Sequence, residues 1–206
     1  FAAKYQQENG KPIATADLIP SSPQAVALQA QYIADNPHPL GEKHQLDAVK
    51  DGSLYERMHA KYHPAIRQFL EQFGYYDIFL IDTESGNIVY SVFKELDFAT
   101  SLKDGPYANT NFAEAFRHAA EATNPNDTFL VDFANYTPSY EAPASFIASP
   151  IFRDGKKVGV LVFQMPVDRI TQVLSQSRGM GETGEVYLVG EDGLMRSNSR
   201  FSETST

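Results

Sequence analysis

The spacing of apolar residues changes from three and four to two near residue 77, and this change limits the fold most. Before it, residues 53–76 place apolar side chains on one face of a helix. Pro64 lies inside that segment and predicts a kink or a break. After it, Asp77–Asp82 and Ile88–Phe93 are predicted as two strands joined by a turn at 83–87. The chain is therefore expected to pack helices against a sheet.

Three further strands are predicted at 128–133, 144–152 and 157–165, the last two joined by the tight-turn pair Asp154-Gly155. Helices are predicted after the N-cap residues Ser22 and Thr110, and from Pro166 onward. Because few helices separate the strands, we expect an α+β fold. In it, long N-terminal helices pack on a five-stranded antiparallel PAS-like sheet.

Composition and motifs argue against several classes of function. The net charge is −9, with 17 basic and 26 acidic residues and no Lys/Arg run, which disfavours nucleic acid and anionic membrane surfaces as partners. Cysteine is absent, so thiolate metal sites, disulfides and cysteine nucleophiles are excluded. No apolar run approaches the roughly 20 residues that span a bilayer.

Two short motifs resemble parts of a metal site and of a catalytic site, but we interpret both as structural. His59 and His63 are four apart and share a helix face, but no third ligand is adjacent, so they are predicted to be solvated. Ser91 and Lys94 spell S-x-x-K without the partner elements that a penicillin-binding site needs. No catalytic residue, cofactor or metal is therefore expected, and the chain is not predicted to be an enzyme.

A hairpin pattern occurs twice in the chain. Residues 77–91 (DIFLIDTESGNIVYS) and 185–197 (EVYLVGEDGLMRS) each have an apolar strand, an acidic turn that contains Gly and a strand ending in Ser. The second copy lacks the strands that would follow it. We expect residues 181–206 to begin a second, incomplete domain.

Three segments carry a family resemblance. The runs GYYDIFLIDTESGNIVYSVFKELDFATSLKDGPYANT, YTPSYEAPASFIASPIF and GETGEVYLVGEDGLMRSNSRF resemble double Cache sensor modules, also called tandem PAS-like or PDC domains. The resemblance covers about residues 36–201. It implies stalk and packing helices at 1–76, a membrane-distal PAS-like sensing domain at 77–165 and a connecting helix at 166–180. A membrane-proximal PAS-like domain then begins at 181–206.

The resemblance also implies a role. Such modules are the periplasmic, ligand-binding parts of inner-membrane receptors, here cut from the transmembrane helices that would anchor them. The expected output is a two-component histidine kinase, with a methyl-accepting chemotaxis receptor as the alternative. The expected partners are an unknown small-molecule ligand and a second copy through the N-terminal helices, with no nucleic acid. Two other functions stay open: a soluble hydrolase, and a module that senses through a partner protein or by dimerising.

One subgroup of the family binds amino acids through Tyr, Arg and Trp after the second strand. This chain has KELDFATSLKDGPY there, and the similarly spaced Tyr62 and Arg67 lie on the helix before the first strand. The amino-acid specificity is therefore not carried over.

A ligand pocket is expected under the segment 136–143, between the third and fourth strands. Asp132 interrupts an apolar strand, so it either selects a cationic or amine group in the pocket or faces water. The other candidates alternate with apolar residues or lie in the lid. The predicted ligand-binding residues are Tyr90, Ser91, Asp132, Tyr136, Tyr140, Ser145 and Phe146.

Overall fold

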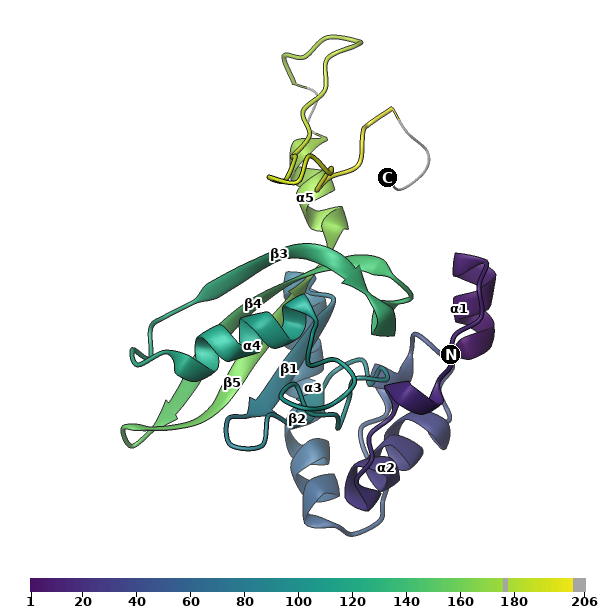
Figure 1. Cartoon of the computed structure of the whole chain (residues 1–206), viewed down its shortest axis with the longest axis vertical. Helices are drawn as coiled ribbons and strands as arrows, with labels where there is room; N and C mark the ends of the chain where they lie inside the picture. The colour runs from purple at the N-terminus through teal and green to yellow at the C-terminus, as the bar shows by residue number, and fades with distance from the viewer. Residues whose placement is uncertain (176–177, 202–206) are drawn as a thin grey trace.

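The computed structural model describes residues 1–175 and 178–201, and its centre is one antiparallel sheet (Figure 1). The strands are β1 (Asp77–Asp82), β2 (Ile88–Ser91), β3 (Phe129–Tyr136), β4 (Ala142–Arg153) and β5 (Lys156–Met165). Their order is β2-β1-β5-β4-β3, and every neighbouring pair is antiparallel. The predicted α+β fold with a five-stranded antiparallel PAS-like sheet is confirmed.

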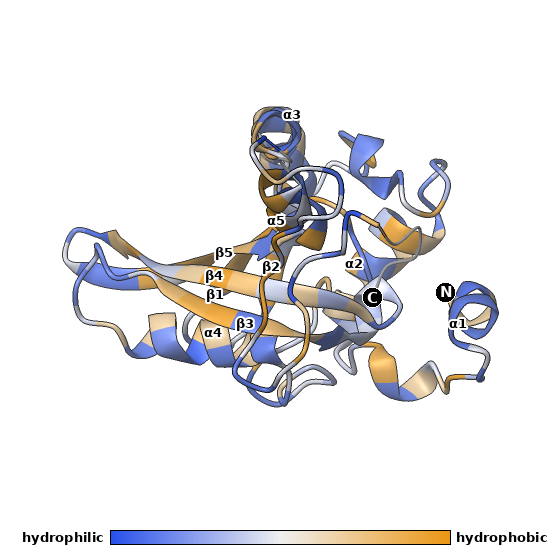
Figure 2. Cartoon of the chain, turned by 90° about the horizontal axis from the view of Figure 1, so that it is seen from above, coloured by the Kyte–Doolittle hydropathy of each residue, from blue (hydrophilic) through white to orange (hydrophobic). Residues whose placement is uncertain are grey.

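Helices cover the two faces of the sheet unequally. Figure 2 shows α3 (Leu54–Phe73) and α4 (Asn111–Glu121) on opposite faces. Helix α4 begins where the Thr110 hydroxyl accepts the Ala113 N–H at 3.3 Å, as the cap pattern predicts. It packs along β3, β4 and β5, whereas α3 packs mainly along β1.

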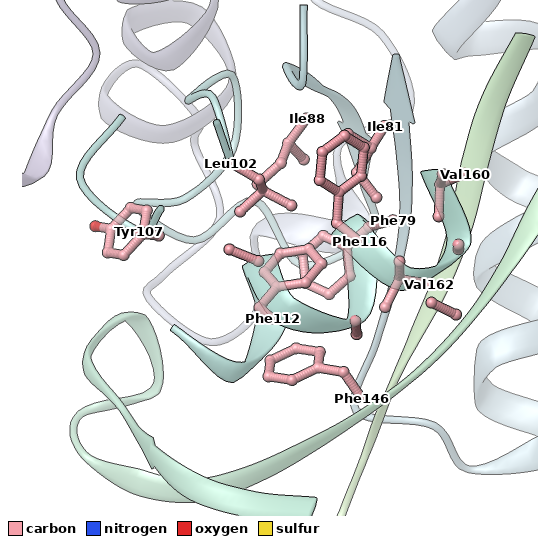
Figure 3. Packing of buried hydrophobic residues seen from close by; sticks show 14 of the residues in the cluster. Phe79, Ile81, Ile88, Leu102, Tyr107, Phe112, Phe116, Phe146, Val160 and Val162 are labelled. Carbon is pink, nitrogen blue, oxygen red and sulfur yellow. The ribbon is translucent and has the colours of Figure 1, made fainter. Parts of the chain in front are cut away.

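The main core lies between α4 and the sheet (Figure 3). The rings of Phe112 and Phe146 stack at 4.6 Å between centroids, and Phe79 lies 4.5 Å from Phe112. Side chains from β1, β5 and the segment after β2 close the cluster. This side of the sheet is filled largely by aromatic rings.

Helix α3 is unbroken although Pro64 lies inside it. Of the kink or break expected at Pro64, the break is wrong, and the kink stays a prediction. The Ser53 hydroxyl accepts the Glu56 N–H at 3.0 Å to start the helix, and Gly74, at φ 69°, ends it. Packing of Leu70 against Ile78 of β1 anchors its second half, and such tertiary contacts outweigh one lost backbone hydrogen bond.

The N-terminal elements wrap one end of the sheet. They comprise α1 (Ala2–Asn9), α2 (Pro23–Gln29) with a π-helical turn at Ala30–Ala34, and short 3-10 turns at Ala16–Leu18 and Lys43–Gln45. Ser22 caps α2 as predicted. The Gln29 side-chain amide donates to the carbonyls of Leu96 and Phe98, at 2.8 and 2.7 Å, and so ties α2 to the segment that follows β2.

The C-terminal part contains α5 (Val167–Leu174) and a loosely built turn (Figure 1). Within 178–201 an antiparallel bridge joins Val189 and Met195, and the Arg196 N–H donates to the Leu188 carbonyl at 2.7 Å. These contacts lie where the second hairpin was expected, but no regular strand is formed there. Within the described residues, none of the helices has the length and apolar character needed to cross a bilayer.

Candidate functional site

A hollow of about 240 Å³ lies where β5 ends and the C-terminal segment passes the β3–β4 connection. Much of its wall is apolar, from Phe133, Pro143, Met165 and Met195. Its polar lining residues are Tyr76, Ser139, Gln164, Asp168, Arg196, Ser197 and Asn198, and the first three are called the polar wall here. Concave sites with an apolar wall and a few convergent polar groups are typical of small-ligand sites.

Directly behind this polar wall lies a group of acids, named here the carboxylate cluster: Asp77 and Asp97, which are buried, and Glu95, which is half-buried. Glu95 accepts hydrogen bonds from the Tyr76 hydroxyl at 2.9 Å and from the Ser139 hydroxyl at 3.1 Å. Gln164 in turn donates its amide to Ser139 at 3.2 Å. The wall of the hollow and the carboxylate of Glu95 are therefore one hydrogen-bonded unit.

Asp77 and Asp97 come from the edge of the sheet. Asp77 begins β1, and its Oδ1 accepts the N–H groups of Ile78, Val92 and Phe93 at 2.6, 2.8 and 3.2 Å. Asp97 accepts the Tyr136 hydroxyl at 2.6 Å. Both acids are fully buried, so Asp77 fixes the end of β2 to β1 from inside the protein.

The cluster has more acceptors than donors. Asp77 Oδ2, Asp97 Oδ1 and Gln164 Oε1 are buried and have no hydrogen-bond partner. All three are oxygens, and Gln164 pairs with Asp77 across β1 and β5. A buried polar atom without a partner costs about 1–3 kcal/mol, so a donor at this place would be strongly favoured.

Burial raises the pKa of all three carboxyl groups. For Asp77, the charge of Asp97 raises the pKa further. Burial raises the pKa of Asp97 to about 6, against the opposing hydrogen bond from Tyr136. The pKa of Glu95 lies well above its usual range because of burial and the charges of Asp97 and Asp77. Three like charges in one buried space cannot all form, so the cluster holds protons near neutral pH.

Lys94 is the cation beside the cluster, and its side chain is already engaged. Its ammonium donates to the Ser91 carbonyl and lies 4.5, 5.1 and 5.7 Å from the ring centroids of Tyr90, Phe98 and Tyr32. Burial lowers the pKa of Lys94, while the charge of Asp77 raises it. The lysine is 3% exposed, so it partly balances Asp77 without facing the hollow.

The structure brings few of the sequence-predicted site residues together. Tyr136 bonds to the carboxylate cluster. Tyr140, at the end of the 3-10 turn Thr137–Ser139, has φ 58°, and its ring stacks on Phe1 at 4.9 Å. Ser145 is buried and donates to the Val131 carbonyl at 2.7 Å.

The other four predicted residues do not line the hollow. Phe146 belongs to the core against α4, and Tyr90 faces α3, where its hydroxyl meets His63. The Ser91 hydroxyl accepts the Lys94 N–H at 2.9 Å. Asp132 is largely exposed, forms an ion pair with Arg196 at 2.8 Å and does not line the hollow.

The solvated state expected for His59 and His63 was wrong: they are 4% and 0% exposed, and their rings stack at 4.3 Å. His63 Nε2 lies 2.6 Å from the His44 carbonyl, and Nδ1 lies 2.7 Å from the Tyr90 hydroxyl. Because the carbonyl only accepts, Nε2 carries the proton. The error arose because His59 and His63 share the helix face of Leu70, which packs on the sheet, and because the segment 43–49 covers their rings.

Neither the carboxylates nor Gln164 was selected from the sequence. The available signal was a polar residue near one end of each of two apolar strands: Asp77 in DIFLID and Gln164 in LVFQM. The acids in KELD looked like an exposed connection, yet Glu95 and Asp97 turn inward. Only the fold reveals that they meet.

Comparisons with known proteins give matches only among solved structures; no protein-family model and no curated protein matches the chain. The ligand-binding domain of the Pseudomonas fluorescens chemoreceptor CtaA, in complex with L-serine, is 17% identical with a TM-score of 0.46, over 84% of this chain and 60% of that one. The sensor domain of the V. cholerae histidine kinase DctB is 18% identical with a TM-score of 0.41, over 82% and 58%.

A further match is the sensory domain of the Campylobacter jejuni chemoreceptor Tlp3 with isoleucine bound. It is 13% identical with a TM-score of 0.47, over 84% of this chain and 62% of that one. The chain thus spans about three fifths of the length of these structures.

Proposed function

We propose that this chain is an extracytoplasmic sensor domain of the double Cache type, which binds a small molecule and signals through a membrane receptor. The observation that carries the proposal is the hollow at the end of β5, backed by a buried polar network with three unpartnered acceptors. Groups with strongly shifted pKa values beside a cleft are typical of functional sites. The PAS-like order of the strands supports the same conclusion.

In finer detail, we propose residues 77–165 as the membrane-distal sensing domain and 1–76 as stalk and packing helices. Residues 166–180 would connect to a second domain that begins at 181–206. The receptor would lie in the inner membrane with this part in the periplasm. Its output domain would be a histidine kinase, with a chemotaxis receptor as the alternative. The chain itself would have no enzymatic activity.

The test is ligand binding at the hollow. A metabolite panel is screened by thermal shift against the chain and against Ala142→Trp, which places a large ring in the wall of the hollow. Ala134→Trp is the matched control, because Ala134 is exposed on β3 outside the hollow. We expect a ligand that stabilises the chain and the control but not Ala142→Trp. A panel without any stabilising compound, or one that stabilises Ala142→Trp equally, would contradict the proposal.

Exposed apolar residues on α3 favour self-association as a second property. Leu54, Met58, Tyr62, Phe69 and Phe73 are each between 40% and 65% exposed and recur at helical spacing. We propose that a second copy covers this stripe. Phe73→Glu is expected to weaken a dimer in sedimentation equilibrium, with Val173→Glu, also exposed, as the control. A monomeric parent chain at all concentrations would refute the dimer and favour a different protein partner.

A further inference from the structure

The chemistry of the ligand follows from the balance of donors and acceptors at the hollow, given that the hollow is the sensing site proposed above. Gln164 is 2% exposed and lines the hollow. Its amide nitrogen is committed to Ser139, whose hydroxyl donates to Glu95, so the orientation of the amide is fixed. Gln164 Oε1 is consequently a buried acceptor without a partner, next to the hollow but not open to it.

Three acids lie behind the polar wall against one cation, Lys94, which partly balances Asp77. Glu95 lies one hydrogen bond behind Tyr76 and Ser139, and the charges of Asp77 and Asp97 act on it. A further acid, Asp168, lines the hollow itself. A ligand group that carries positive charge would be stabilised by the field of these acids.

The cations near the hollow are unavailable to an anionic ligand. The Lys94 ammonium lies among three aromatic rings and donates to Ser91. Arg196 lines the hollow, but all three guanidinium nitrogens are occupied: Nε and Nη2 donate to Asp132, Nη2 also to Asp192, and Nη1 to the Leu194 carbonyl. A ligand carboxylate would therefore find no free positive partner here.

We propose that the hollow takes a small aliphatic amine without a carboxylate, whose ammonium lies against the wall of Tyr76, Ser139 and Gln164 and is neutralised by the carboxylate cluster behind that wall. The apolar wall of Phe133, Met165 and Met195 would contact the methylene groups. A volume of about 240 Å³ is below the roughly 300–1,000 Å³ of drug-sized pockets and suits a ligand of a few heavy atoms. Tyr76 and Phe133 offer ring faces of the kind that attract ammonium groups.

Binding would release a proton from the cluster. The empty cluster holds protons because burial raises the pKa of its acids. An arriving ammonium keeps its own protons, one carboxyl group loses its proton to solvent, and a carboxylate–ammonium pair remains. Linkage then requires the association constant to rise by about tenfold per pH unit for each proton released.

The experiment is isothermal titration of the chain with putrescine and n-butylamine at pH 6.0 and 7.0, each in phosphate and in the sulfonate buffer ACES. We expect binding that is about tenfold tighter at pH 7.0, and a heat that differs between the buffers by the ionisation enthalpy of about one proton. Glu95→Gln is expected to weaken binding at least tenfold. Asp154→Asn, a carboxyl in the exposed β4–β5 turn, should leave binding unchanged. Thermal melts establish that each variant is folded, and Asp97→Asn replaces Glu95→Gln if the latter is not.

The same titrations with L-serine, succinate and glucose separate the two proposals. Binding of one of these at a site that Ala142→Trp blocks, without binding of the amines, would overturn the amine assignment but leave the sensor function standing. Amine binding without proton release, or unaffected by loss of the carboxylates, would also overturn it. No binding by any compound would refute both.

Discussion

The chain is expected to lose part of its free energy of unfolding in acid because His59 and His63 are buried as neutral rings. Replacing both with glutamine should abolish that part of the loss. His59 donates from Nδ1 to the Asp47 carbonyl at 2.9 Å, and its Nε2 is buried without a partner. A second proton on this ring would create a buried N–H with no acceptor. On His63, a second proton would place an N–H against the Tyr90 hydroxyl, which now donates to that nitrogen.

The surroundings add to the cost of charging these rings. Burial is the largest cause, followed by the positive charge of Lys94, and Arg67 acts in the same direction. Tyr32, Tyr55 and Tyr90 face the rings as neutral groups, and His44 contributes its carbonyl. Together these lower the pKa to about 3 for His59 and about 4 for His63.

The size of the effect follows from linkage. An unfolded histidine titrates near pH 6.5, so between pH 6.5 and the folded pKa the unfolded state binds more protons. The stability contributed by the neutral rings is fully present above pH 6.5 and is lost as the pH falls. At pH 5.0 each ring accounts for about 2 kcal/mol of loss, or about 4 kcal/mol for the pair, against a typical total of about 5–15 kcal/mol.

Urea unfolding of the chain and of the double variant His59→Gln/His63→Gln at pH 5.0 and 7.5 measures this loss. Between the two pH values, the parent chain should lose about 4 kcal/mol more than the variant. His118→Gln, an exposed histidine on α4 paired with Glu114, is the control and should follow the parent chain. A difference between parent and double variant that stays constant within about 0.5 kcal/mol would show that the pair is charged or solvated in the folded protein.

Three further outcomes are expected. Phe146→Ala empties the centre of the aromatic core and should lower the free energy of unfolding by about 3–5 kcal/mol in urea; a loss below about 1 kcal/mol would contradict this packing. Tyr136→Phe removes the donor to Asp97 and should cost about 1–3 kcal/mol while raising the pKa of that acid further, which a carboxyl NMR titration would detect as an upward shift. Arg196→Gln opens its partly solvated pairs with two acids and should cost at most about 1 kcal/mol, yet it should speed protease cleavage within 178–201; unchanged cleavage would show that these pairs do not hold the segment.

Strands and caps could be predicted from the sequence because their signals are local. The hairpin turn at Asp154-Gly155, the caps at Ser22 and Thr110 and the period-two strands lie where they were expected. Pro64 misled because a local rule about one hydrogen bond was outweighed by packing of the whole helix on β1. Local rules fail where long-range contacts decide the outcome.

The candidate site was harder to predict because its residues are distant in sequence. Asp77, Glu95 and Gln164 meet only after β5 pairs with β1 and the segment after β2 turns inward. The sequence drew attention to the tyrosines in the β3–β4 connection, and of these Tyr136 does bond to the cluster. The carboxylates of the site could not be predicted, because acids near glycine and lysine in a connecting segment resemble those of solvated turns.

The segment 90–97 connects two buried polar groups whose responses to pH have opposite signs. On one side, Tyr90 bonds to His63, and acid destabilises the histidine pair. On the other, Glu95 and Asp97 have raised pKa values, so their contribution is fully present in acid and is lost as the pH rises through those values. The two effects offset each other between about pH 4 and 6.5. The free energy of unfolding of the parent chain could therefore stay constant over this pH range although both groups titrate. Variants of the histidines alone or of the carboxyl groups alone would separate the two contributions.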